Sequence, residues 1–321
     1  MNYIKMSPLT GMVGYGGGVT GLTFNAGSAG MEWVGDRGLI GGGFEGSYVN
    51  NIDRLVLTST ANASDFGDLT SSRNAPGALS DMSRGVFAGG EDGGNSYVWT
   101  TDYVTINNTG NATNFGNLTA KRRGAAGTSD GSRGLFSGGQ PGVGYNGNTI
   151  DYITINSTGN ATDFGDLTQS RYHGAGWNTK TRSIHAGGGD NNTIDYVEFN
   201  TTGNSTDLAD LTQNRTGTCG AGDITRMVIN GHGSPNGVIE YKEMETTANA
   251  VDFGDDLSSG RGWMGAMANA TRTFFAAGYD HTNANDNAIS SVVTQTLGNA
   301  TDWGNTTAQR RLVGCCSGNA S

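Results

Sequence analysis

The chain is poor in proline, cysteine and lysine. It has 4 Pro beside 55 Gly among 321 residues, so it lacks the composition of a proline-rich linker. The glycines recur at fixed offsets within patterned segments, which argues against low-complexity disorder. The three cysteines, Cys219, Cys315 and Cys316, have neither the framework of a disulfide-rich domain nor a metal-binding spacing. We expect them to be small buried residues in strands.

Long apolar runs and an excess of positive charge are also missing. No stretch approaches the length of a membrane span, and the N-terminus lacks the uninterrupted apolar core of a secretory signal. We therefore expect synthesis in the cytoplasm without a signal peptide, and no membrane partner. The net charge of −10 comes without a basic stripe, so a nucleic acid partner is not expected.

A repeat fills most of the chain. Residues 83–119 read SRGVFAGG, a variable stretch and TDYVTINNTGNATNFGNLT, and residues 132–168 repeat this wording closely. The Arg of the RG-x-F-x-GG unit, or of its near variants, recurs at intervals of 44 to 49 residues: Arg37, Arg84, Arg133, Arg182, Arg226 and Arg272. A period of this length predicts structural units stacked into one cooperative body.

Each repeat contains four short strand candidates separated by turn residues. The first follows an Arg and has small side chains, as in GAAGTS after Arg123, which suits strands crowded around an axis. The second is RG-x-F-x-GG, whose paired glycines permit positive φ and end the strand. The third alternates apolar and polar residues, as in residues 150–155, and the fourth is NATDFGDLT after a tight TGN turn.

Six units of four antiparallel strands predict an all-β fold, a six-bladed β-propeller. The Arg-led first strand, the Gly-Gly after the second, the Tyr in the third and the aromatic residue in the fourth resemble the kelch repeat. The fourth-strand aromatic residue is mostly Phe, where kelch repeats usually carry Trp. The NATDFGDLT wording is similar to that of repeat proteins of marine bacteriophages described as virion structural or tail-fibre proteins, which implies a virion or appendage role.

The repeats also predict how the ring closes. The chain enters the first repeat at its second strand, near Arg37, and ends with a first strand after Arg310. Three N-terminal strands and one C-terminal strand should therefore complete one blade, which removes the exposed edges of an open array. We expect residues 34–321 to form the propeller. Residues 1–33 should form a Gly- and Met-rich arm that either docks on a neighbouring subunit or covers a face of its own propeller.

Arginine outnumbers lysine 15 to 4, and twelve of the arginines occupy two repeated positions. Because the planar guanidinium suits a carboxylate partner, and because recurrence in every blade marks a scaffold, we predict structural ion pairs and caps here. The predicted members are Arg37, Arg84, Arg133, Arg182, Arg226 and Arg272, with Asp102, Asp151 and Asp195. Anion or glycan contact by the arginines, and calcium at the Asp-x-x-Asp pairs, are the alternatives.

The connection between the second and third strands differs in every repeat. Variable loops on one face of a rigid scaffold are where binding residues usually lie. The aromatic residues expected there could stack on sugars, pack on a protein or simply cover the loop bases: Tyr48, Tyr97, Trp99, Tyr145, Tyr279 and His281.

No group of residues indicates catalysis. The four histidines fall in different repeats, and no Ser/His/Asp grouping, phosphate loop or separate carboxylate pair stands out. We expect no catalytic residue, no metal and no cofactor. The expected function is that of a non-enzymatic virion structural or appendage protein, such as a tail fibre or capsid decoration. It would contact other subunits through its arm and a host-surface glycan through its loops. The alternative is a free carbohydrate-binding or protein-interaction propeller outside any virus.

Overall fold

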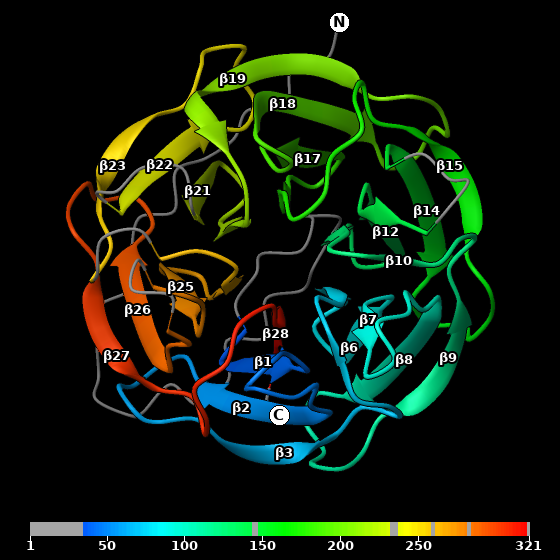
Figure 1. The fold of residues 1–321 in the computed structure, drawn as a ribbon. Coiled ribbons are helices and arrows are strands. Elements are labelled where there is room, and N and C mark those ends of the chain that lie inside the picture. The colour runs from blue at the N-terminus through cyan, green and yellow to red at the C-terminus, as the bar shows by residue number, and fades with distance from the viewer. Residues whose placement is uncertain (1–34, 143–146, 232–236, 258–260, 281–283, 320–321) are drawn as a thin grey trace, which may run out of the picture. The chain divides into compact units, whose positions relative to one another are not determined.

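A computed structural model describes residues 35–142, 147–231, 237–257, 261–280 and 284–319. Six four-stranded antiparallel sheets surround a common axis, as Figure 1 shows. This confirms the predicted six-bladed propeller. Across the described ranges no helix is suited to crossing a membrane. The expected arm, residues 1–33, lies outside these ranges.

The strands occupy equivalent positions in every blade, from the axis outwards. The first strands are β5 (Gly77–Ser80), β11 (Ala126–Ser129), β16 (Ala175–Asn178), β20 (Thr218–Gly222), β24 (Gly265–Ala268) and β28 (Gly314–Gly318). The second strands are β1 (Arg37–Gly41), β6 (Arg84–Ala88), β12 (Arg133–Ser137), β17 (Arg182–Ala186), β21 (Arg226–Gly231) and β25 (Arg272–Ala276). The third strands are β2 (Asn51–Val56), β8 (Thr100–Thr105), β14 (Thr149–Thr154), β18 (Asn191–Glu198), β22 (Val238–Glu243) and β26 (Ala288–Val293).

The fourth strands form the rim of the ring. They are β3 (Ser64–Asp68), β9 (Thr113–Asn117), β15 (Thr162–Asp166), β19 (Thr206–Arg215), β23 (Val251–Asp255) and β27 (Thr301–Asn305). Two short ribbons accompany the blades, one of β4 (Arg73–Asn74) with β7 (Glu91–Asp92), the other of β10 (Arg122–Arg123) with β13 (Gln140–Pro141).

The closing blade combines the two ends of the described chain, as predicted. Strand β28 pairs antiparallel with β1, in a register that places Leu39 opposite Cys316. The sheet order is β28-β1-β2-β3, so one C-terminal strand completes three N-terminal strands. We number this closing blade 1 and the others 2 to 6 in chain order, so that blade 2 contains β5 and blade 6 contains β24. Each inner strand contacts the inner strands of both neighbouring blades, so the ring is continuous around the axis. The three cysteines lie in the inner strands β20 and β28.

Small residues permit this crowding at the axis. A Cβ on Gly127 of β11 would lie 2.1 Å from the carbonyl oxygen of Ala78 in β5. Apolar side chains then fill the space between neighbouring sheets. Leu39 of blade 1 and Phe87 of blade 2, for example, belong to one buried cluster and are both 0% exposed.

The NATDFGDLT segments join neighbouring blades at the rim of the ring. The Asn160 side chain accepts a hydrogen bond at 3.1 Å from the backbone N–H of Asn117 in the preceding blade. Equivalent bonds join every pair of neighbouring blades, through Asn62, Asn111, Asn204, Asn249 and Asn299. Gly116, with a φ of +155°, lies so close to the next turn that a Cβ would be 2.1 Å from the Gly159 oxygen. The turn asparagines therefore have a structural role in this fold.

Buried ion pairs fasten the crossings to the blades that they enter, and they use the arginines before the first strands. Arg73 lies 2.7 Å from Asp102, Arg122 lies 2.9 Å from Asp151, and Arg171 pairs with Asp195. Arg215 pairs with Glu240, and Arg310 lies 2.6 Å from Asp53. The Thr of the Asp-Leu-Thr wording donates to the same carboxylate, as Thr70 does to Asp102. The predicted acidic residues thus pair with a different set of arginines from the one predicted.

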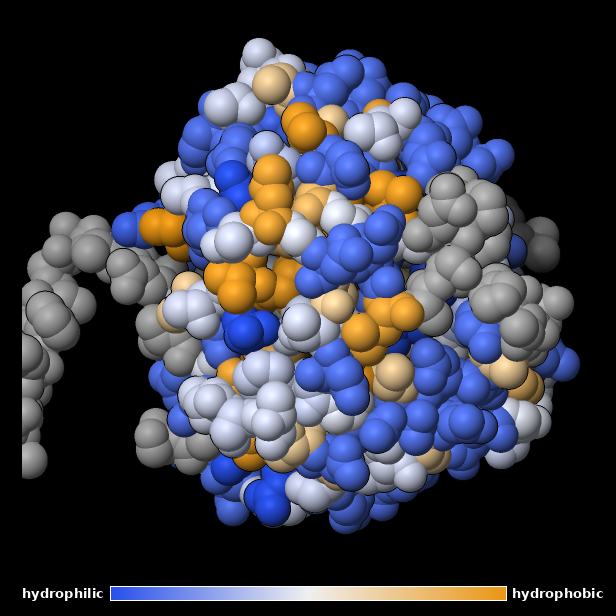
Figure 2. Space-filling model, turned by 90° about the vertical axis from the view of Figure 1, so that its left-hand side faces the viewer, coloured by the Kyte–Doolittle hydropathy of each residue, from blue (hydrophilic) through white to orange (hydrophobic). Residues whose placement is uncertain are grey.

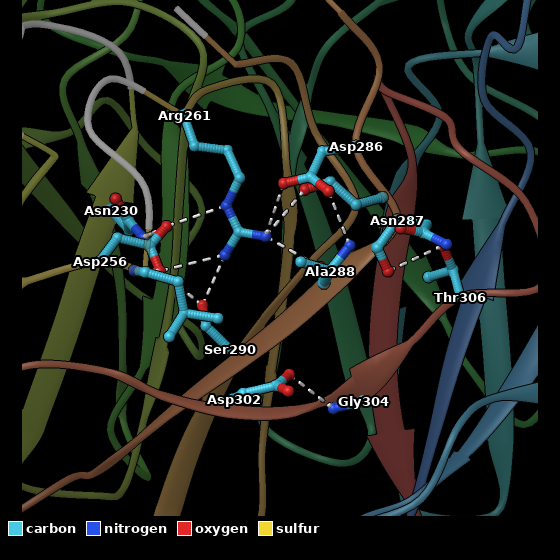
Figure 3. Close-up of polar contacts among 12 residues, drawn as sticks. Asn230, Asp256, Arg261, Asp286, Asn287, Ala288, Ser290, Asp302, Gly304 and Thr306 are labelled. Carbon is cyan, nitrogen blue, oxygen red and sulfur yellow. Dashed lines mark hydrogen bonds and ion pairs between the residues drawn. The ribbon is translucent and has the colours of Figure 1, made fainter.

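Blade 6 replaces this carboxylate with a serine, as Figure 3 shows. Ser290 occupies the position that Asp102 and Asp151 take in their blades, each opposite a buried Phe. Arg261 instead pairs with Asp256, at 2.9 Å, and Ser290 donates to Asp256 at 2.6 Å. The buried guanidinium therefore retains a carboxylate partner, supplied from the preceding blade.

The second-strand arginines mostly contact backbone and aromatic rings. Arg37 and Arg84 donate to carbonyl oxygens of Ile106 and Ile155 in the next blade, at 2.6 and 2.9 Å, and Arg133 donates to that of Phe199. Arg272 donates to Ser291 within its own blade. Arg182 and Arg226 pair with Glu198 and Glu243. Five of them lie over an aromatic ring of their own blade: Arg84, Arg133, Arg182, Arg226 and Arg272.

Candidate functional site

One face of the propeller carries both the variable connections and the crossings from blade to blade. The crossing residues Arg73–Asn74 pair with Glu91–Asp92 of the variable connection in blade 2, and Arg122–Arg123 pair with Gln140–Pro141 in blade 3. Phe44 pairs in the same way with Arg311. We call this face the loop face. Where a crossing pairs in this way, the inner strand begins a few residues after the repeated Arg, for example at Gly77 in the repeat that has Arg73.

A ring of backbone hydrogen bonds surrounds the axis on this face. Six residues of this ring, here called the axial collar, all have φ between +49° and +67°: Ala75, Gly124, His173, Gly217, Trp263 and Leu312. The bond to the His173 carbonyl is donated by the N–H of Thr218, the residue after Gly217, at 2.9 Å. The N–H of Gly124 donates to Ala75, that of His173 to Gly124, and that of Ala75 to Leu312, at 2.6 to 2.8 Å. Their left-handed backbone, joined by these hydrogen bonds, fixes the crossings of the loop face relative to one another.

The two glycines of the axial collar make room for its aromatic members. A Cβ on Gly124 would lie 2.5 Å from the imidazole of His173, and one on Gly217 would lie 3.0 Å from the indole of Trp263. Trp263 then packs edge-on against Tyr279, with ring centroids 5.7 Å apart. The collar thereby leads into the aromatic side chains of the variable connections.

Aromatic and charged side chains form a continuous arc on the loop face. We call it the loop-face arc; its members are Trp263, Tyr279, Arg311, Phe44, Tyr48, Glu91, Tyr97 and Arg123, from the connections and crossings of blades 6, 1, 2 and 3. The Arg311 guanidinium carbon lies 4.4 Å from the ring centre of Tyr279 and 5.0 Å from that of Phe44. Phe44 packs edge-on against Tyr48, at 5.5 Å.

The second half of the arc is more polar. The Tyr48 hydroxyl donates to the Asn95 side chain at 2.7 Å. Burial raises the pKa of Tyr48, and the neighbouring Glu91 carboxylate adds to the rise. Glu91 pairs with Arg123, which lies over the Tyr97 ring at 5.4 Å and donates to Gln140 at 2.9 Å. The arc therefore presents planar polar groups beside aromatic faces.

Trp99 is the most exposed of the four predicted binding residues that the structure describes. Its backbone carbonyl accepts a bond from Leu118, as those of Asn50 and Asn148 do from their fourth strands, so Trp99 occupies an Asn position of the repeat. Its side chain is 45% exposed, and the Lys121 ammonium lies 5.5 Å from the ring centre. An indole in place of an amide side chain therefore presents a flat apolar surface to solvent at this position.

Of the predicted binding residues, the structure brings three into the arc and places a fourth beside its blades. Tyr48, Tyr97 and Tyr279 belong to the arc, and Trp99 stands at the outer end of a blade 2 connection. Tyr145 and His281 lie outside the described residues. The sequence prediction omitted Phe44, Glu91, Arg123, Trp263 and Arg311. The Arg-Arg doublets at 122–123 and 310–311 were the available signal, because other repeats have a single Arg there.

A narrow channel of about 120 Å³ runs along the axis inside the collar. Its walls are the small residues and backbone of the inner strands, with Ser80, Ser129 and Ser317 among them. His173 borders it, and burial lowers the pKa of His173 to about 3, with Arg123 adding to the fall. Burial likewise lowers the pKa of His185 to about 3, with a further effect of Arg171. Within the described ranges no group of three or more His, Cys, Asp or Glu is placed to hold a metal ion.

The rim has a different surface character. Figure 2 views the molecule from the side of blades 5 and 6, where apolar side chains lie among polar ones. The exposed large apolar residues of these two blades are Val251, Leu257, Val293 and Leu297, of which Leu297 is 57% exposed. Apolar residues exposed among polar neighbours are common on protein surfaces, so they single out no site.

In comparisons with known proteins, no family model and no curated protein matches this chain.

Proposed function

We propose that this propeller is a non-enzymatic recognition module of a virion or another extracellular appendage, and that it binds carbohydrate with its loop face. The loop-face arc carries the proposal. It joins side chains of four consecutive blades through ring contacts, cation–π contacts and an ion pair, on a collar of left-handed residues. A binding surface built on such a scaffold is organised before the ligand arrives, which lowers the entropic cost of binding.

The side chains of the arc suit a sugar. The C–H faces of pyranose rings pack on aromatic rings, and hydroxyl groups need planar donors and acceptors beside those rings. Tyr97 and Tyr279 supply rings, while Asn95, Gln140 and Asn285 supply amides that already bond neighbouring arc residues. Trp99 adds an exposed indole on the same face.

The proposed membership of a virion or appendage rests on the sequence alone, where the NATDFGDLT segment resembles repeats of phage structural proteins. Mass spectrometry and cryo-electron microscopy of purified particles from the producing organism test this part. The protein should be present in stoichiometric amount in the particles or in another extracellular assembly. Its absence from both would leave the free carbohydrate-binding or interaction propeller.

A glycan array probed with the full chain tests carbohydrate binding. Trp99→Ala should weaken the signal, while Leu297→Ala should leave it unchanged, because Leu297 is at least as exposed but lies in a third-to-fourth strand turn at the opposite end of a blade. Equal signals from the wild type and Trp99→Ala would remove Trp99 from the binding surface. Absence of signal on every glycan would count against carbohydrate recognition altogether.

A further inference from the structure

Arg123 and Arg311 occupy the same position in two different repeats. Each directly follows the buried arginine that precedes a first strand, and each pairs through its backbone with the residue after the Gly-Gly of its own blade. That residue is Gln140 for Arg123 and Phe44 for Arg311. The two arginines therefore provide an internal comparison.

Their neighbours from the preceding blade differ in charge. The residue after Gly-Gly in blade 2 is Glu91, whose carboxylate pairs with Arg123. The equivalent residue in blade 6 is Tyr279, which offers Arg311 a ring at 4.4 Å instead of a carboxylate. Arg123 is thus neutralised within the protein. Among the ion pairs of the described residues, by contrast, none involves Arg311.

The guanidinium of Arg311 is nevertheless held in place. One nitrogen, Nη1, donates to Asn285 at 3.1 Å, and Asn285 in turn donates to the Phe44 carbonyl oxygen at 3.1 Å. The rings of Phe44 and Tyr279 both lie within 5.0 Å of the guanidinium carbon. Its other nitrogens donate to none of the described residues and are not among the buried atoms lacking a partner, so solvent reaches them.

We propose that Arg311 is a carboxylate subsite of the loop face, and that the ligand is an acidic sugar whose carboxylate takes the place that Glu91 has at Arg123. An oriented guanidinium matches the two oxygens of a carboxylate with two parallel hydrogen bonds. The flanking rings of Phe44 and Tyr279 would receive the sugar ring that carries this carboxylate. This inference rests on the proposed carbohydrate recognition and specifies its ligand class.

Nuclear magnetic resonance tests the subsite with sodium glucuronate as the probe and glucose as the neutral counterpart. Glucuronate should shift the Arg311 Nε–Hε resonance in a saturable manner, and glucose should not. Arg311→Gln should weaken glucuronate binding about tenfold or more, the effect of losing a charge-assisted hydrogen bond. Arg311→Lys, which keeps the charge but loses the paired donors, should give an intermediate loss.

Arg182→Gln is the matched control, because Arg182 lies outside the loop-face arc and already pairs with Glu198, and it should change glucuronate binding less than twofold. Thermal unfolding of each variant verifies that the ring is intact. An unshifted Arg311 resonance, or equal losses for the two Gln variants, would overturn the subsite. If the glycan array still shows binding in that case, only this inference fails; if the array is also blank, the proposed function fails with it.

Discussion

Arg310 and Asp53 join the two ends of the described chain: Arg310 Nη2 lies 2.6 Å from Asp53 Oδ2, and each side chain is 1% exposed. The Thr307 backbone N–H and hydroxyl donate to the same carboxylate, at 3.0 and 2.8 Å. The closing blade is therefore fastened by a buried polar network as well as by the pairing of β28 with β1.

Loss of the Arg310–Asp53 ion pair should lower the stability of the fold. Asp53→Asn leaves a buried guanidinium without its counter-charge, so we expect the free energy of unfolding to fall by about 3 to 5 kcal/mol. Asp65→Asn, at an exposed position of the same blade, should change it by no more than about 0.5 kcal/mol. Urea unfolding followed by circular dichroism measures both. Equal stability of the two variants would show that the pair contributes nothing to closure.

The contact between neighbouring blades at the rim gives a second prediction. Gly116→Ala places a methyl group 2.1 Å from the Gly159 oxygen at a φ of +155°, and we expect a loss of about 2 to 3 kcal/mol. Gly159→Ala meets nothing within 4 Å and should cost less than about 1 kcal/mol. Chemical denaturation of the two variants provides the comparison, and similar losses would contradict the interlocking role assigned to the fourth strand.

His185 gives a prediction about pH. Its pKa is about 3 in the folded chain, below its ordinary value of 6.5, because burial disfavours the charged imidazole. Below pH 6.5 the His185 imidazole is protonated in the unfolded chain but remains neutral in the folded chain. The free energy of unfolding therefore falls with pH until the pH reaches about 3.

His185→Phe, which restores the residue that β6 and β12 carry at this position, should remove the part of that dependence due to His185 and leave the part due to His173. Between pH 6.5 and 4.5 the wild type should lose about 2 to 3 kcal/mol more than the variant does. Unfolding titrations at several pH values measure the difference. Identical pH slopes would mean that His185 is protonated in the folded state.

The sequence was sufficient to predict the blades and their closure because these depend on what recurs. Three features of the sequence act within one unit or between identical units. They are the small residues of the first strands, the paired glycines after the second strands, and the offset of the repeat from the chain ends. The strand order β28-β1-β2-β3 follows from that offset.

Contacts made by the crossings and between different blades were harder to predict. The repeat sequence alone did not show that Asp102 would meet Arg73 rather than a second-strand arginine, because Arg73 reaches Asp102 from the crossing that enters the blade. Blade 5 supplies Asp256 in place of the carboxylate that Ser290 replaces in blade 6, a compensation visible only when both blades are in place. The loop-face arc was missed for the same reason, since Arg311 joins Phe44 and Tyr279 from blades at opposite ends of the chain.

The most direct test of the central claim is a glycan array that compares the wild-type chain with a loop-face variant, Tyr48→Ala/Trp99→Ala/Arg311→Gln, and with the rim variant Leu297→Ala. Binding of the wild type and of Leu297→Ala to the same glycans, with loss of signal in the loop-face variant, is the predicted result. Binding that survives in the folded loop-face variant would contradict recognition through this face.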